Sequence, residues 1–100
     1  MSGLEPLIHA PARLELCGLL APVDDAEFSY LRDRIGVSDS VLSKHAKALE
    51  DAGYVKVIKK TSASRQRTWL SLTPAGREAF RAHVRELQRL AGLVGRSMPS

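Results

Sequence analysis

Several residue types that would indicate a known kind of scaffold are scarce in this sequence. It holds a single cysteine, Cys17, so it cannot form an intramolecular disulfide, which fits a reducing cytoplasm. No apolar run approaches the ~18 residues that cross a bilayer. The N-terminus also lacks the basic start and continuous apolar core of a signal peptide. We therefore expect a soluble cytoplasmic protein that does not act at membranes.

Motifs for catalysis and for metal binding are missing as well. We find no nucleophile motif, no glycine-rich phosphate loop and no pair of catalytic carboxylates, so the sequence predicts no enzyme and no cofactor. His9, His45 and His83 together with Cys17 suggest a metal sensor. No two of these residues lie at the short separations typical of zinc sites, and we expect no metal site.

Basic charge, in contrast, is concentrated in one part of the chain. Residues 54–70 hold five basic residues and no acidic one, whereas residues 1–27 carry a net charge of −4 and residues 28–53 carry none. Residues 71–100 carry +3, which brings the whole chain to +4. A localised basic segment favours a polyanion partner that binds one face in a fixed orientation.

The composition predicts one globular domain of the α+β class, mainly α. The chain has 100 residues, of which 44% are hydrophobic and 26% charged. We place the domain at residues 1–95 and expect a disordered tail over residues 96–100. Pro11, followed by apolar residues at helical spacing, predicts a first helix that ends before Pro22.

The next segment is expected to contain two helices separated by a tight turn. After a minimal strand at Glu27-Phe28-Ser29, Ser29 is expected to cap a helix that Gly36 ends. Ser38 is a good N-cap for a further helix, which continues as far as Gly53. On that helix an apolar stripe must pack inward, leaving a polar and mildly basic outer face; the stripe consists of Leu42, Ala46 and Leu49.

A β-hairpin and a long helix complete the predicted chain. Strands from Val55 to about Lys60 and from Thr68 to Leu72 are separated by the polar loop Thr61–Gln66. Thr73-Pro74 then opens a helix that runs to about Ala91, with apolar residues spaced alternately by four and three, as in a heptad seam. The seam is either internal core or a dimer contact, and we expect dimerisation because so small a domain offers little core to cover. The dimerisation residues are Phe80, Val84, Leu87 and Ala91.

This order of elements, and several of the residues in it, resemble a known class of regulators. The similarity lies in the Gly36-Val37-Ser38 turn, the junction Leu49-Glu50-Asp51-Ala52-Gly53-Tyr54-Val55 and the segment Leu72-Thr73-Pro74-Ala75-Gly76-Arg77. These segments resemble the compact MarR-like and ArsR-like winged helix-turn-helix regulators, over roughly residues 6–90. The resemblance implies a three-helix core, a β-hairpin wing and a long C-terminal helix. It also implies a cytoplasmic homodimer that binds a palindromic operator, often in response to a small molecule, whose identity is unknown here.

The outer face of the third predicted helix carries the candidate residues for reading DNA. An α-helix fits the major groove, and the side chains of its N-terminal part reach base edges. Asp39 would oppose a phosphate but can accept a hydrogen bond from a cytosine amino group, and Val41 is equally consistent with the core. For the lysines, the alternative is an exposed face that only maintains solubility. The candidates are Ser38, Asp39, Ser40, Val41, Ser43, Lys44 and Lys47.

The wing supplies a second set of candidates. Arg65 and Arg67 suit phosphates or a narrow minor groove, where the negative potential is enhanced. As alternatives, the hairpin tip is merely solvated, or Arg67 pairs with an acidic residue of another element. The candidates are Lys59, Lys60, Ser64, Arg65 and Arg67.

Together these features predict sequence-specific binding of double-stranded DNA by a homodimeric transcriptional regulator, with repression the expected role. The competing hypothesis is a winged-helix module that binds proteins and not DNA. Such a module would show an acidic or apolar exposed face on the third helix and a short or neutral wing, whereas here both carry basic residues. Four arginines spaced by four residues on the last helix favour a solvated face over a second DNA-binding or acidic-partner surface; they are Arg77, Arg81, Arg85 and Arg89.

Overall fold

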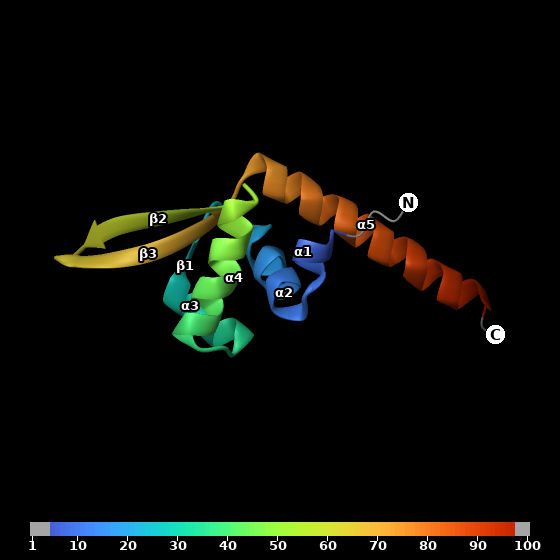
Figure 1. Ribbon diagram of the computed structural model, residues 1–100, viewed down its shortest axis with the longest axis horizontal. Helices are drawn as coiled ribbons and strands as arrows, with labels where there is room; N and C mark the ends of the chain where they lie inside the picture. Colours follow the sequence, from blue (N-terminus) through green and yellow to red (C-terminus); the bar gives the residue numbers. More distant parts are fainter. Residues whose placement is uncertain (1–4, 98–100) are drawn as a thin grey trace.

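A computed structural model describes residues 5–97 of the chain. Its helices are α1 (Pro6–His9), α2 (Pro11–Leu20), α3 (Phe28–Ile35), α4 (Asp39–Asp51) and α5 (Pro74–Ser97), and its strands are β1 (Ala26–Glu27), β2 (Val55–Ser62) and β3 (Arg65–Leu72). The molecule measures 60 × 25 × 22 Å, because the β2–β3 hairpin and α5 project in opposite directions from a body of short helices (Figure 1). Within residues 5–97, no helix is both long and apolar enough to cross a membrane.

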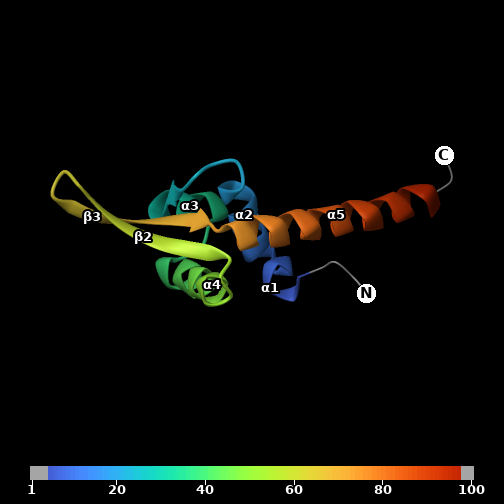
Figure 2. The ribbon, with the colours of Figure 1, turned by 90° about the horizontal axis from the view of Figure 1, so that it is seen from above.

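The core lies where α1 to α4 meet the sheet. The predicted inward stripe of α4 is confirmed, since Leu42, Ala46 and Leu49 are all buried. Figure 2 shows α3 and α4 on either side of the base of the hairpin. The sheet order is β1-β3-β2, with both pairings antiparallel. The large buried side chains of the core are Ile8, Leu16, Leu20, Leu31, Leu42, Leu49 and Leu70.

Local signals placed the helix-turn-helix segment correctly, apart from one cap. Gly36 ends α3 with a φ of 80°, and the Ser38 hydroxyl accepts a hydrogen bond from the Val41 amide at 3.2 Å. The predicted cap at Ser29 is wrong. The helix already begins at Phe28, and the Ser29 hydroxyl, inside the first turn, donates to the Glu27 carboxylate at 3.0 Å.

The hairpin is longer and its turn tighter than predicted. Ser62 pairs with Arg65, so the loop is only Ala63-Ser64 where a polar loop of six residues was expected. Both turn residues have positive φ, 51° and 65°. Two consecutive residues of this kind give a hairpin turn that matches the twist of the flanking strands, and this allows the ladder to continue to the tip.

The N-terminal end of α5 is fixed by a close approach of two backbone segments. The Thr73 hydroxyl accepts from the Gly76 amide at 2.9 Å, which confirms the predicted cap. The same hydroxyl donates to the Gly53 carbonyl at 2.6 Å. A Cβ on Gly76 would lie 2.1 Å from the Tyr54 carbonyl oxygen, so this position admits glycine alone.

Both ends of the chain differ from the prediction. The helix α1 was missed, although the Glu5 carboxylate caps it and Pro6 opens it. The last helix continues past Ala91 to Ser97, because a glycine costs a helix only about 1 kcal/mol and two good helix formers, Ala91 and Leu93, flank Gly92. Residues 96 and 97 are therefore helical, whereas residues 98–100 of the predicted tail lie outside the described residues.

Candidate nucleic-acid interface

The exposed face of α4 presents the candidate reading residues together. Its buried stripe turns the opposite side outward, so Ser38, Asp39, Ser40, Val41, Ser43, Lys44 and Lys47 are all exposed. Val41 is 39% exposed, so it belongs to the outer face and not to the core. Free amides at the start of the helix favour an anion there.

Asp39, at the start of α4, is already paired. Its carboxylate accepts from the Arg32 guanidinium at 2.8 Å, and Arg32 also reaches Asp33 at 2.9 Å. The hydrogen bonds to Asp33 and Asp39 raise the pKa of Arg32. Because Arg32 compensates the charge of Asp39, this carboxylate opposes a nearby phosphate less than its sequence position suggested.

The two lysines of α4 differ in their surroundings. Lys47 donates to Asp51 one turn further on, at 2.8 Å, and this hydrogen bond raises the pKa of Lys47. Such an exposed pair contributes little to stability, so a phosphate can replace it. Lys44 forms no ion pair with any described residue. It is the cation on this face that needs no rearrangement to meet an anion.

The wing cations also fall into two groups. Lys60 pairs with Asp25 at 2.9 Å and lies 4.6 Å from the centre of the Trp69 ring, while Arg67 pairs with Glu27 at 2.7 Å. The hydrogen bond from Arg67 lowers the pKa of Glu27. For Lys59 and Arg65, both exposed, the described part of the chain supplies no acidic partner.

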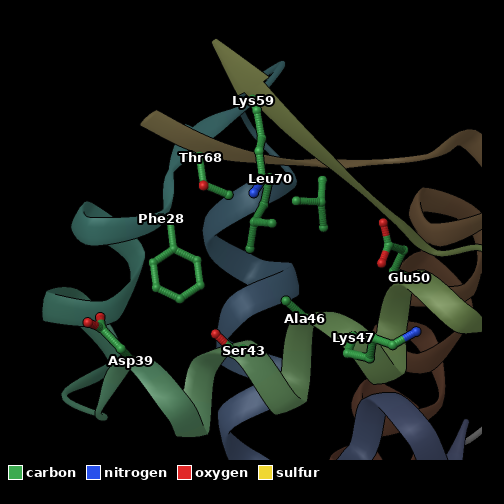
Figure 3. A pocket seen from close by; sticks show the side chains of 10 residues that line it. Phe28, Asp39, Ser43, Ala46, Lys47, Glu50, Lys59, Thr68 and Leu70 are labelled. Carbon is green, nitrogen blue, oxygen red and sulfur yellow. The ribbon is translucent and has the colours of Figure 1, made fainter. Parts of the chain in front are cut away.

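A groove of about 420 Å³ separates α4 from the hairpin (Figure 3). Its floor is apolar and includes Phe28 and Leu70, which lie between α4 and the strands in Figure 3. Ser43 of α4, Lys59 of β2 and Thr68 of β3 line its sides. Sequence reasoning missed Thr68, although strand alternation places it on the same sheet face as Leu70.

A polar network on the other side of the body was also missed. His83 of α5 is fully buried, and its Nδ1 accepts from the Glu5 amide at 3.1 Å. Its Nε2 therefore carries the proton and donates to His9 Nδ1 at 3.2 Å. Glu5 also accepts from the Tyr54 hydroxyl at 3.0 Å. This network connects α1 to α5 and to the start of the hairpin.

The other histidine and the cysteine play packing roles in the structure. His45 lies 3.1 Å from the Arg13 guanidinium, and burial followed by the Arg13 charge lowers the pKa of His45. Cys17 is fully buried, which raises the pKa of its thiol to about 11. Among the residues described, no three His, Cys, Asp or Glu side chains converge as metal ligands.

The arginines of α5 lie on its surface but do not behave alike. Arg77 donates to the carbonyls of Ala21 and Val23, at 2.7 and 2.8 Å, and so fastens α5 to the end of α2. The remaining three pair with acidic residues of α5 itself: Arg81 and Arg85 with Glu78, and Arg89 with Glu86. Arg81, Arg85 and Arg89 therefore lie on a solvated face of α5, whereas Arg77 does not.

The proposed dimerisation residues are unequally available. Phe80 is partly buried against the core, with its ring 3.8 Å from the position of a Cβ on Gly18. Val84 and Leu87 are half-buried and Ala91 is exposed. Beyond them Leu90 and Leu93 are 36% and 44% exposed, on the part of α5 that projects from the body (Figure 1).

Comparison with known proteins places this arrangement in a family. A model of the winged helix DNA-binding domain matches residues 12–91. An uncharacterised protein of Methanocaldococcus jannaschii is 29% identical over 85 residues, which are 85% of this chain and 92% of that protein.

Solved structures of similar fold support the same family assignment. A structure described as a transcriptional regulator homologue from Pyrococcus horikoshii is 28% identical with a TM-score of 0.82, covering 94% of this chain and 91% of that one. A MarR-family transcriptional regulator from Silicibacter pomeroyi has the same fold at 20% identity, with a TM-score of 0.68 and coverage of 94% and 62%. These matches confirm the predicted fold class and the resemblance to MarR-like winged-helix regulators.

Proposed function

Because the chain belongs to the winged helix DNA-binding domain family and is a DNA-binding regulator, we propose that it recognises a specific duplex sequence as a homodimer and represses transcription there. The observation that carries the proposal is that exposed cations lie on the outer face of α4 and on the wing. Lys44 lies on the outer face of α4, Lys59 lines the hairpin side of the groove, and Arg65 lies at the tip of the hairpin. Among the described residues, none of the three has an acidic partner.

The spacing of the elements suits B-form DNA. The outer face of α4 enters the major groove, where Ser40, Ser43 and Lys44 meet base edges and phosphates. The wing tip, with Ser64 and Arg65, then reaches the adjacent minor groove. The phosphodiester strand that divides the two DNA grooves runs between α4 and the hairpin.

The space between α4 and the hairpin offers donors to that strand. Ser43 and Thr68 present hydroxyls and Lys59 an ammonium group along the groove. Two carboxylates also line it: Asp39, whose charge is compensated by Arg32 at 2.8 Å, and Glu50, near the far end of α4. These contacts fix the protein on the duplex, while the α4 side chains discriminate between sequences.

The exposed apolar surface of α5 supports dimerisation. Leu90, next to Leu87 on the helix, and Leu93, next to Leu90, widen the apolar surface formed by Val84, Leu87 and Ala91, so a second copy would cover them. A chain of 100 residues buries a limited fraction of its own surface, and an interface adds stability. A two-fold dimer presents two α4 helices to a palindromic operator. A small-molecule effector and a cytoplasmic location stay predictions.

The proposal is tested by variants that remove one charge each. Duplexes selected from genomic fragments are titrated by fluorescence anisotropy with wild type, Lys44→Ala and Arg65→Ala. Removal of one phosphate or base contact is expected to weaken binding about tenfold, since such contacts are worth roughly 1–3 kcal/mol. Arg81→Ala is the matched control, because it removes a cation from α5, away from α4 and the wing.

Two results would count against this function. One is the failure of wild-type protein to bind any duplex at low salt. The other is an equal affinity for Lys44→Ala, Arg65→Ala and Arg81→Ala, because the binding surface would then not be the α4 and wing face. Unfolding midpoints of all variants establish that the fold is kept.

A further inference from the structure

The acidic segment formed by residues 24–27 runs beside the hairpin, from Ser71 near its base to Arg67 beyond its middle. Glu27 accepts from Arg67 at 2.7 Å, and Asp25 accepts from Lys60 at 2.9 Å. The Asp24 carbonyl accepts from the Ser71 hydroxyl at 2.6 Å. Three successive contacts therefore join this segment to both long strands.

Lys60 and Arg67 are directly opposite each other in the β2–β3 ladder. Like charges at such cross-strand positions repel, so this pair destabilises the hairpin unless acidic groups lie nearby. Asp25 and Glu27 supply these groups, and the four side chains form one neutral cluster. The Lys60 ammonium also lies over the Trp69 ring, which holds it close to the sheet.

Strand alternation separates this cluster from the groove. Side chains at successive positions of a strand point to opposite faces, so Lys60 and Arg67 share a sheet face with Trp69. Lys59 and Thr68 are on the other face, the one that lines the groove beside α4. Arg65 shares the sheet face of Arg67, but it lies at the tip of the hairpin, two residues beyond the cluster. The cluster itself therefore lies away from both the groove and the tip, the two parts of the wing that the proposed function assigns to DNA.

We infer that Arg67 and Lys60 are positioning residues, which set the orientation of the wing through Glu27 and Asp25, and that Lys59 and Arg65 make the wing's contacts with DNA. The inference rests on the proposed function and narrows it, because Lys60 and Arg67 were expected to bind phosphates themselves. Beyond the two residue pairs of β1 with β3 and the contact of Ser71 with Asp24, these ion pairs join the hairpin to the body, and they do so nearest to its tip. Partly exposed ion pairs contribute little to global stability, so variants in them are expected to fold.

A charge swap distinguishes positioning from contact. In the single variants Glu27→Arg and Arg67→Glu like charges meet, so both are expected to bind the selected duplex at least fivefold more weakly than wild type. The double variant Glu27→Arg/Arg67→Glu restores an ion pair and is expected to return to within about threefold of wild type. If Arg67 instead contacts a phosphate, the double variant stays as weak as Arg67→Glu, and that result overturns the inference.

The neutral variant Glu27→Gln tests whether loss of this ion pair weakens or strengthens DNA binding. Loss of a positioning contact weakens binding, whereas release of a phosphate-binding arginine from a competing carboxylate strengthens it. Tighter binding by Glu27→Gln would therefore overturn the inference. Lys60→Gln and Asp25→Asn are expected to follow the same pattern with smaller changes, because Lys60 retains its contact with Trp69.

A distance measurement on the protein without DNA tests the positioning role independently of the proposed DNA binding. Spin labels at Ala63→Cys, on the wing tip, and Glu15→Cys, on α2, report the wing angle as a distance distribution. Cys17 is fully buried with a raised thiol pKa, so it does not take up label. We expect a broader distribution in Arg67→Glu and a return to the wild-type width in the swapped double variant. Unchanged widths in every variant would overturn the positioning role, whether or not wild type binds DNA.

Discussion

The hairpin and α5 both project from the same small body, but they are attached by different forces. Ion pairs between partly exposed side chains, such as Arg67 with Glu27, hold the middle of the hairpin. The first half of α5 is held by buried contacts, in which Gly76 lies against the Tyr54 backbone and His83 has no exposed surface. Exposed ion pairs are weak and are screened by salt, whereas buried packing is not. The wing is therefore attached less firmly than α5.

The largest expected effect tests the fixed attachment of α5. Gly76→Ala places a Cβ 2.1 Å from the Tyr54 carbonyl oxygen, so the two segments must separate, and we expect a loss of about 3 kcal/mol in the free energy of unfolding. Gly92→Ala is the matched control on the same helix, since a Cβ there meets nothing within 4 Å. It should stabilise the protein by about 0.5–1 kcal/mol.

Urea unfolding followed by circular dichroism measures both glycine variants. Equal stabilisation by the two substitutions would contradict the close approach at Gly76, because alanine generally favours a helix over glycine. It would also remove the contrast between the buried attachment of α5 and the exposed attachment of the wing.

The projecting half of α5 gives the next prediction. Replacing Leu90 and Leu93, 36% and 44% exposed, with glutamate should convert a dimer into a monomer, because two carboxylates would be buried in the interface. Arg85→Glu introduces the same group on the charged face of α5, away from both leucines, and should leave the dimer intact. Sedimentation equilibrium provides the masses. A monomeric wild type, or a dimer that survives in the double leucine variant, would refute the proposed interface.

Acid should loosen the attachment of α5 before it affects the wing. Burial, followed by the His9 charge, lowers the pKa of His83 below its ordinary value of 6.5, with Glu5 acting in the opposite direction. A lowered folded-state pKa contributes stability that is present above 6.5 and is lost as pH falls through the folded value. His45 acts in the same direction. Glu27, also lowered, contributes above 4.5 and is lost only below that.

We therefore expect the urea midpoint to fall between about pH 7.5 and pH 5, and to fall less steeply in His83→Gln. A Gln side chain does not titrate, yet it can accept the Glu5 amide hydrogen bond. His9→Asn is the companion variant, as it removes the neighbouring ring and leaves His83 buried. An identical pH profile in wild type and His83→Gln would show that this histidine does not govern the acid sensitivity of α5.

The smallest effect concerns the wing tip. Ser64 has a φ of 65°, a conformation that glycine adopts without steric cost, so Ser64→Gly should raise the stability by up to about 1 kcal/mol. Gln66→Gly, within β3, is the control and should destabilise. Thermal unfolding compares the two. A destabilised Ser64→Gly would contradict the tight two-residue turn.

The sequence predicted those features that depend on neighbouring residues. Ser38, Gly36 and Thr73 placed helix ends correctly, because capping involves residues within one turn. The partners of Arg67 and Lys60 could not be identified in the same way, since Glu27 and Asp25 lie 40 and 35 residues away. Their pairing depends on how β1 joins the sheet, which no local spacing encodes.

Two misses did have local signals. Glu5 followed by Pro6 is the same cap-and-proline pattern that located α5, and it could have predicted α1. Glu27, which precedes Phe28, competed with Ser29 as the start of α3. The burial of His83 depends instead on α1 packing against α5, more than 70 residues apart in sequence.

The salt dependence of DNA binding tests the central claim most directly. For the selected duplex, log K against log salt concentration, from about 50 to 250 mM KCl, should be a descending line whose slope reflects the phosphates neutralised. We expect the slope to become shallower by about one in Lys59→Ala and in Arg65→Ala, and to stay unchanged in Glu27→Arg/Arg67→Glu and in Arg81→Ala. A binding constant independent of salt, or slopes that do not distinguish these variants, would contradict a DNA interface formed by α4, Lys59 and the tip of the wing.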